Sequence, residues 1–266
     1  MDGPGFERLV VTTSRKPTSE EELQAMALAR ELGLPYVPRR GSLHEFGATA
    51  ILVVTRERLV IQTQAGEIFF HPGMARPRVR QLERGQQDVM VQAMDLRPGD
   101  AVLDCTLGLG SDAIVAAFVT GERGRVVGLE AVPVLAALVR WGLAHHDPGH
   151  DGLRAAMRRI EVVCAEHEEY LAQLPDRSFD IVYFDPMFRE PVHQSASMRP
   201  WRALACYKSL TRAAIAAASR VARRRVVVKE RSGSPVFAEL GLTRVVGGRK
   251  SRIAYGILDV AAGEGP

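Results

Sequence analysis

Strand-forming and helix-forming segments alternate from residue 101 to residue 229, and this alternation constrains the fold more than any other feature of the sequence. Apolar, β-branched runs predict strands, and helical periodicity predicts the helices between them. We expect strands at 101–105, 125–130, 160–164, 179–184 and 224–229, and helices at 86–94, 111–120, 132–145, 166–173 and 202–221. Such alternation predicts a parallel sheet wrapped by helices.

The chain leaves this pattern after residue 229. Two more strands are expected at 242–247 and 251–258, and the Gly-Arg-Lys turn between them predicts a hairpin. We therefore predict an α/β, Rossmann-like domain over residues 81–260, with a mostly parallel seven-stranded sheet that ends in an antiparallel hairpin. Most dinucleotide dehydrogenases would continue with another crossover helix instead.

Residues 1–80 are predicted to form a small N-terminal α/β subdomain. A first strand at 8–13 is followed by a helix, and three short runs at 48–55, 58–63 and 67–70 have the pattern of a meander. The helix is expected to begin at Thr18 or Ser19, and Ser19 precedes Glu22 by three residues as in a capping box.

The composition of the chain indicates where the protein is expected in the cell and what it could bind. No apolar run approaches the roughly 18 residues of a membrane span, and the N-terminus lacks the apolar core of a secretory signal. The three cysteines are far apart and odd in number, which favours free thiols in the cytoplasm over disulfides. The net charge of +4 rests almost entirely on arginine, which suits phosphate contacts but is also typical of GC-rich genomes.

A turn with two glycines follows the strand at 101–105 and begins the next helix. Gly108 and Gly110 permit both the turn and a close approach of a ligand to the backbone. Glu130 follows Gly110 by 20 residues and ends the next strand, where a carboxylate can accept hydrogen bonds from ribose hydroxyls. A nucleotide cofactor is therefore expected at this turn.

Two classes of cofactor share this spacing, because Gly108 and Gly110 also fit a relaxed dinucleotide fingerprint. Asp104 favours S-adenosylmethionine (SAM), since a carboxylate there can face the amine of a methionine moiety but would repel a pyrophosphate. The alternative role of Asp104 is to cap a helix. Glu166 could accept from the adenine amine or simply stabilise a helix N-terminus. The residues expected to bind SAM are Asp104, Thr106, Gly108, Gly110, Ser111, Asp112, Glu130 and Glu166.

A second polar turn, Asp185-Pro186-Met187-Phe188, ends the strand at 179–184, at the edge where open α/β sheets bind ligands. It suits the exocyclic amine of a nucleobase, a poor nucleophile because its lone pair is delocalised. Asp185 and the carbonyl of Pro186 can accept the N–H bonds of this amine, and Phe188 can stack on a flipped base. We predict N-methyl transfer with these three residues as the catalytic group, and an ordinary Asp-Pro turn is the alternative.

Two other chemistries are not expected. Cysteine-based methylation of a pyrimidine carbon needs a thiolate near the acceptor turn, whereas Cys105 and Cys164 lie at strand positions and Cys206 lies well past the turn. A metal site at His145, His146 and His150 is less favoured than an exposed, mobile loop with a Pro-Gly turn.

Several basic residues could contact a nucleic acid. Arg76, Arg78 and Arg80 alternate, so in an extended segment they would point to one side and grip phosphates, with a solvated linker as the alternative. Arg189 follows the acceptor turn, and Lys229 ends a strand at the ligand edge, where it could approach a phosphate or pair with an acid such as Asp185.

Five stretches resemble the class I SAM-dependent methyltransferases of the bacterial family that methylates guanine N2 in 16S ribosomal RNA. They are residues 102–113, 128–130 with 133–138, 185–188, 225–229 and 252–255. Met187 is the most telling position, and the resemblance covers about residues 95–258 but little of the first 60. It implies a cytoplasmic enzyme that uses SAM, with ribosomal RNA or the small ribosomal subunit as its partner. Here Arg189-Glu190 follows the acceptor turn, where the family tends to have proline and basic residues.

Other functions are open from the sequence. The same fold could methylate an adenine, a cytosine or a protein amide. A nicotinamide-dependent oxidoreductase could use Gly108, Gly110 and Glu130, and a ribosome-assembly protein could bind RNA without catalysis.

Overall fold

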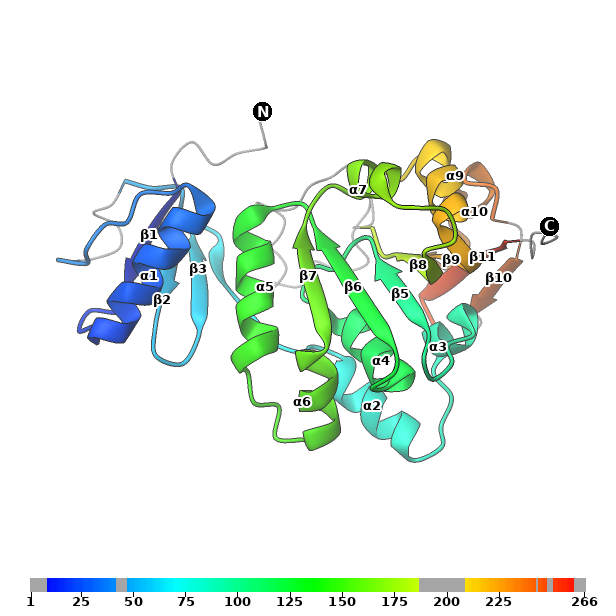
Figure 1. Ribbon diagram of the computed structural model, residues 1–266, viewed down its shortest axis with the longest axis horizontal. Coiled ribbons are helices and arrows are strands. Elements are labelled where there is room, and N and C mark those ends of the chain that lie inside the picture. The colour runs from blue at the N-terminus through cyan, green and yellow to red at the C-terminus, as the bar shows by residue number, and fades with distance from the viewer. Residues whose placement is uncertain (1–8, 42–46, 187–208, 243, 248–250, 261–266) are drawn as a thin grey trace. The chain divides into compact units, whose positions relative to one another are not determined.

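The computed structural model describes residues 9–41, 47–186, 209–242, 244–247 and 251–260 (Figure 1). The chain forms two compact units. Unit 1 comprises Met1–His71, Val132–His146 and His193–Cys206, and unit 2 comprises Pro72–Ala131, Asp147–Val192 and Tyr207–Pro266. The domain boundary between residues 80 and 81 stays a prediction. Within the described residues, no helix is both long and apolar enough to cross a membrane.

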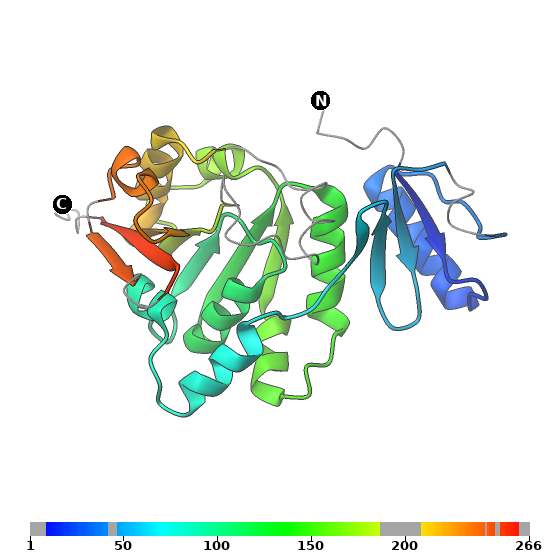
Figure 2. The same ribbon diagram turned by 180° about the vertical axis from the view of Figure 1, so that it is seen from behind.

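Unit 1 contains a four-stranded sheet in the order β1-β2-β3-β4 (Figure 2). Its strands are β1 (Leu9–Thr13), β2 (Ala50–Val54), β3 (Leu59–Thr63) and β4 (Gly66–Phe69). The last three strands form the predicted antiparallel meander, and β1 pairs with β2 in parallel. This small α/β subdomain confirms the sequence prediction. Unit 1 also holds α5 (Pro133–His145), whose Gly142 lies against the ring of Phe70.

Helix α1 (Ser19–Leu32) follows β1 and begins where the sequence predicts. Thr18, not Ser19, is the N-cap: its hydroxyl accepts from the amide of Glu21 at 3.2 Å, and the Glu21 carboxylate accepts from the amide of Thr18 at 2.7 Å. Both Ser19 and Thr18 satisfy the spacing rule, so only the extended backbone of Thr18 (φ −78°, ψ 161°) decides between them.

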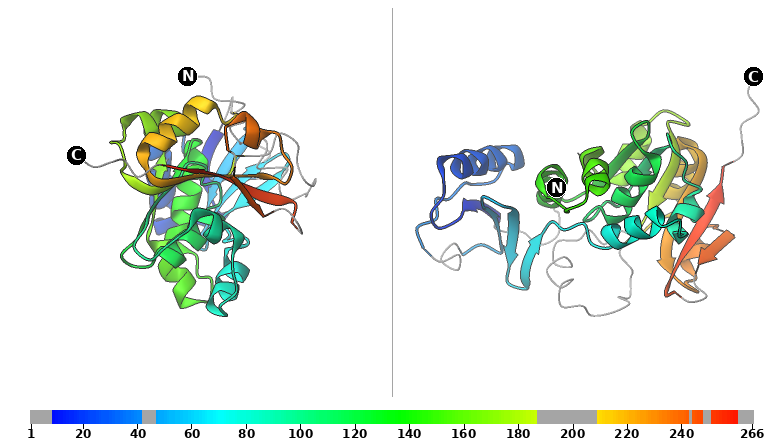
Figure 3. Two further views of the ribbon diagram at one scale, coloured as in Figure 1. Left: turned by 90° about the vertical axis from the view of Figure 1, so that its right-hand side faces the viewer. Right: turned by 90° about the horizontal axis from the view of Figure 1, so that it is seen from below.

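Unit 2 contains the seven-stranded sheet, in the order β10-β11-β9-β8-β5-β6-β7 (Figure 3). The strands are β5 (Ala101–Asp104), β6 (Arg125–Glu130), β7 (Ile160–Cys164), β8 (Phe179–Phe184), β9 (Ala222–Arg231), β10 (Arg244–Gly247) and β11 (Ile253–Asp259). All neighbours from β9 to β7 are parallel, while β11 is antiparallel to both β9 and β10. The predicted parallel sheet with a terminal hairpin is therefore confirmed.

Helices cover both faces of this sheet. They are α2 (Ala75–Glu83), α3 (Val89–Met94), α4 (Ser111–Thr120), α6 (Asp151–Arg158), α7 (His167–Gln173), α9 (Arg212–Val221) and α10 (Val236–Glu239). On one face, buried side chains such as Leu103, Val182 and Val226 form a core with Leu171 of α7 and Ile215 of α9.

Two local predictions are wrong. Residues 76–80 are helical rather than extended, because Pro77 lies in the first turn of α2, where its missing N–H costs nothing. The segment that follows α5 is not a loop as far as Gly152, because α6 begins at Asp151 and the His150 ring accepts from the amide of Leu153 as its N-cap. In the predicted helix 202–221, residues 202–208 lie outside the described residues.

The capping of α1 can be tested by two neighbouring substitutions. Thr18→Ala removes an acceptor for a helix N–H and should lower the free energy of unfolding by about 1 kcal/mol. Ser19→Ala should change it little, because the Ser19 side chain caps nothing in the structure. Urea denaturation measures both, and a larger loss for Ser19→Ala would contradict the assignment.

Candidate functional site

The cofactor turn and the acceptor turn lie together at one edge of the unit 2 sheet. Strand β5 pairs in parallel with β8, in the register Asp104 to Tyr183. The amide of Cys105 donates to the carbonyl of Tyr183 at 2.9 Å, and the amide of Asp185 donates to the hydroxyl of Thr106 at 2.5 Å. Thr106 thus joins the two turns, a role that its sequence position alone does not show.

Two glycines give the cofactor turn its shape. Gly108 (φ 50°) and Gly110 (φ 76°) both have left-handed backbones, which other residues adopt at a cost. Gly110 is the N-cap of α4, and no side chain caps this helix. The first amides of α4 therefore point toward the turn, where a helix N-terminus favours electron-rich ligand atoms.

Asp104 is a buried carboxyl group beneath the turn, with 2% of its surface exposed. Its Oδ1 atom accepts from the amide of Thr106 at 3.0 Å. Burial raises the pKa of Asp104 to about 8, so the group is mostly neutral at pH 7. A cationic ligand group beside it would favour ionisation. The alternative role as a helix cap does not apply to α4, whose N-cap is Gly110.

Lys229 lies between two carboxylates at the carboxyl-terminal edge of the sheet. Its Nζ atom donates to Asp185 Oδ2 at 2.7 Å and to Asp112 Oδ2 at 2.9 Å. The sequence left two roles open for Lys229, and the structure shows the pairing with Asp185. Burial raises the pKa of Asp185 to about 6, with Lys229 opposing and Asp112 reinforcing the shift.

Asp112 has more partners than any sequence pattern indicates. Besides Lys229, it accepts from the Tyr183 hydroxyl at 2.7 Å and from the guanidinium of Arg78. Burial alone would raise the pKa of Asp112, but Lys229 and Arg78 lower it to about 2. Asp112 is 8% exposed and held by these three groups, and its contact with the cofactor stays a prediction.

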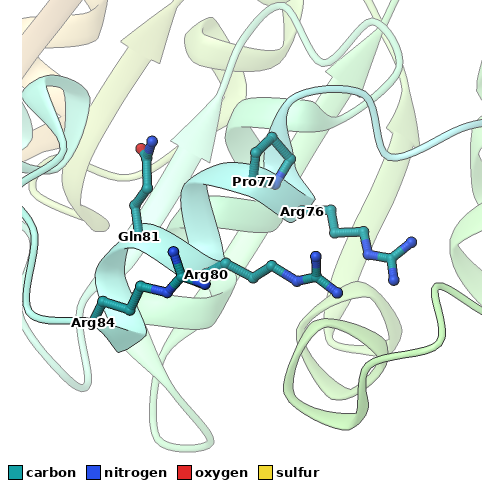
Figure 4. A pocket seen from close by; sticks show the side chains of 5 residues that line it. All are labelled: Arg76, Pro77, Arg80, Gln81 and Arg84. Carbon is teal, nitrogen blue, oxygen red and sulfur yellow. The ribbon is translucent and has the colours of Figure 1, made fainter.

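Arg78 reaches this cluster from α2. Its guanidinium also donates to both carboxylate oxygens of Asp88, at 2.7 and 2.9 Å, and its side chain is only 15% exposed. In the helix, Arg76 and Arg80 lie on a different, exposed side (Figure 4). The three arginines therefore do not point to one side, as the extended segment would have required.

The other predicted cofactor residues lie at the same edge. Ser111 is the half-buried first residue of α4, and Glu130 ends β6 opposite Cys164 of β7. Glu166 is the N-cap residue of α7, the position that its alternative role predicts, but its side chain makes no capping hydrogen bond. Pro186 directly follows Asp185 and is half-buried, whereas Phe188 and Arg189 lie outside the described residues.

The described cysteines and histidines form no second site. Burial raises the pKa of the Cys105 thiol, which disfavours a thiolate nucleophile, and Cys164 is exposed on β7. The residue Cys206 lies outside the described residues. Where the structure describes the chain, no three His, Cys, Asp or Glu side chains gather as metal ligands would.

The ion pairs of Lys229 predict a large response to its removal. Lys229→Met leaves two carboxylates without their shared cation, so the free energy of unfolding should fall by about 3 kcal/mol. The pKa of Asp185 should rise further above about 6, which carboxyl-carbon NMR against pH would measure.

Arg223→Met is the matched control on the same strand, because Arg223 pairs with Asp180 in a largely exposed position. It should cost less than about 1 kcal/mol. An unchanged Asp185 titration in Lys229→Met would contradict the described pairing.

Comparison with known proteins identifies a family that matches this chain and two proteins that are similar to it. Residues 41–256 match a family described as "Putative SAM-dependent methyltransferase". The chain is 40% identical over 257 residues to protein YpiP of Bacillus subtilis, covering 95% of this chain and 100% of that protein. It is 33% identical over 233 residues to ribosomal RNA small subunit methyltransferase J of Edwardsiella ictaluri, covering 83% and 88%.

A solved structure supports the fold. The SAM-dependent methyltransferase NGO1261 of Neisseria gonorrhoeae superposes with a TM-score of 0.66 at 18% identity, covering 94% of this chain and 95% of that one. The family match spans most of the chain, including both turns at the sheet edge. This chain belongs to the SAM-dependent methyltransferase family, and S-adenosylmethionine is its cofactor.

Proposed function

We propose that this enzyme methylates the exocyclic N2 atom of a guanine in the RNA of the small ribosomal subunit. The pairing of Asp185 with Lys229, directly after β8, is the observation that carries the proposal. Relatives named ribosomal RNA small subunit methyltransferase J support the class of substrate. Such a substrate would place the enzyme in the cytoplasm, where ribosomes assemble.

The charge of Asp185 suits a guanine. With a pKa of about 6, Asp185 is mostly a carboxylate at neutral pH, and a carboxylate only accepts hydrogen bonds. Guanine offers two adjacent donors, the ring N1–H and the N2 amine. Adenine and cytosine place an acceptor nitrogen beside their amines, which would face the second carboxylate oxygen unfavourably. Asp185 therefore favours guanine among the planar amines that the sequence left open.

The residues at the cofactor turn fit S-adenosylmethionine. We propose that Asp104 faces the methionine amine, that Glu130 accepts from the ribose hydroxyls and that Glu166 lies near the adenine. The left-handed Gly108 and Gly110 allow the ligand to approach the backbone. When bound, S-adenosylmethionine supplies a methyl group on a positively charged sulfur. Because the chain belongs to this family, we exclude the alternative function of a nicotinamide-dependent oxidoreductase.

The chain's own groups would orient and activate the acceptor. Asp185 and the Pro186 carbonyl accept the N–H bonds of the amine and so increase electron density on its nitrogen. Lys229 keeps Asp185 ionised, and Asp112 holds Lys229 in place. In-line placement of the acceptor nitrogen accounts for much of the rate, and Asp185 is a base that could take the proton as the methyl group arrives.

The acceptor role of Asp185 can be tested with Asp185→Asn. Cofactor binding in calorimetry should stay within about threefold, while methyl transfer falls by about 100-fold or more. For the unaltered enzyme, activity should fall as pH drops through about 6, because protonated Asp185 can no longer accept two hydrogen bonds.

Asp176→Asn is the control, since Asp176 is 72% exposed and pairs with Arg220 away from the ligand edge. Mass spectrometry of nucleosides from reacted 16S ribosomal RNA should show N2-methylguanosine. Methylated adenine or cytosine in its place would refute the proposed target, and full activity of Asp185→Asn would refute the site.

The buried carboxyl group of Asp104 leads to a separate prediction, about proton release when the cofactor binds. An ammonium group placed beside this neutral carboxyl would ionise it, so cofactor binding near pH 7 should release protons. The apparent binding enthalpy should then differ between phosphate and Tris buffers. Asp104→Asn should abolish this difference and weaken binding by about tenfold or more. Buffer-independent heats in the unaltered protein would contradict the assignment.

A further inference from the structure

The outer face of α2 and its C-cap residue carry three arginines that the ion-pair cluster does not use. Arg76, Arg80 and Arg84 are spaced four residues apart, so they lie along one side of the helix over about 12 Å of its axis. All three are exposed. Together with Pro77 and Gln81, they line an open hollow of about 420 Å³ (Figure 4). We call these three residues the arginine stripe.

The arginine stripe differs from most of the described arginines of unit 2. Its side chains make no ion pair with any residue that the structure describes. Glu83, the acid of α2, is paired with His150 at 3.1 Å. Most other arginines of this unit have a carboxylate partner; examples are Arg97, Arg125, Arg154, Arg220, Arg223, Arg224, Arg225 and Arg244. Three neighbouring guanidinium groups without a counter-charge repel one another unless an anion binds them.

We propose that the arginine stripe binds the sugar-phosphate backbone of the RNA substrate. This inference rests on the proposed function, and it divides the arginines of α2 and its C-cap into two roles. Arg78, from the inner side of α2, holds Asp112, which contacts Lys229 and through it Asp185. Arg76, Arg80 and Arg84 bind phosphates on the outer side. Helix α2 therefore carries the arginine stripe on its outer side and, through Arg78, contacts the ion-pair cluster of Asp112, Lys229 and Asp185.

The chemistry of α2 favours RNA over a lipid surface. A helix that lies in a membrane interface needs an apolar face for the acyl boundary. In α2 the apolar residues Ala75 and Val79 are buried inside unit 2, and Pro77 is the one apolar residue among those that the helix exposes. Guanidinium forks match phosphate oxygens, and several of them along a line suit a repeating backbone better than a single small anion.

Salt dependence of RNA binding tests the proposal. We would measure filter binding of 16S ribosomal RNA, transcribed in vitro, between about 50 and 200 mM potassium chloride. The triple variant Arg76→Gln, Arg80→Gln, Arg84→Gln should lower the slope of log K against log salt by about 2 to 3. Replacing the same three residues by lysine, which keeps the charges, should restore most of the slope.

The matched control removes equal charge at three other exposed arginines of unit 2. Arg97, Arg123 and Arg177 are exposed and precede β5, β6 and β8, at the amino ends of these strands. Their triple glutamine variant should change the slope by less than about 1. Cofactor calorimetry on both triple variants should match the unaltered protein, which shows that each is folded.

Three results would overturn the proposal. They are an unchanged slope in the stripe variant, an equal loss in the control variant, and stripe-dependent binding to phosphatidylglycerol vesicles in place of RNA. The binding assay does not depend on methylation. RNA affinity that depends on the stripe, without N2-methylguanosine as product, would refute the proposed target and leave this inference intact.

Discussion

The Lys229 ammonium group, placed between Asp112 and Asp185, is the interaction on which the site depends. It joins β9 to the start of α4 and to the end of β8, three elements far apart in the chain. Removing charges from water costs several kcal/mol for each ion, so such a cluster persists only if each member is paired. Arg78 and the Tyr183 hydroxyl complete the pairing of Asp112. The acceptor turn is thus held by electrostatics as well as by the strand that precedes it.

Three carboxyl groups at this edge have clearly different proton affinities. The pKa is about 8 for Asp104, about 6 for Asp185 and about 2 for Asp112. Burial raises the pKa in every case, and the difference follows from the contacts: Asp112 is paired with two cations, Asp185 with one and Asp104 with none of its own. Environments that separate the pKa values of neighbouring acids also separate their roles. Here they distinguish a mostly neutral carboxyl group in Asp104, a mostly ionised one in Asp185 and a fully ionised one in Asp112.

In helix α2, the side to which each arginine points depends on whether the segment is extended or helical. Alternating arginines at 76, 78 and 80 share a side only in an extended chain. In a helix, residues two apart differ in direction by about 200°, so Arg78 faces inward while Arg76 and Arg80 stay exposed. Pro77, which disfavours a helix interior, is tolerated in the first turn, and this position made the helix hard to predict.

The sequence alone determined the sheet, its terminal hairpin, the two turns and the likeness to SAM-dependent methyltransferases, because periodicity and glycine positions are local properties. It also brought Asp104 and Asp185 to one edge, since carboxyl ends of parallel strands meet there. Only the tertiary structure decided that Lys229 pairs with two acids and that Arg78 and Tyr183 join them. These contacts depend on side chains that are up to 117 residues apart in the chain, and no local pattern specifies which partner a buried charge will find.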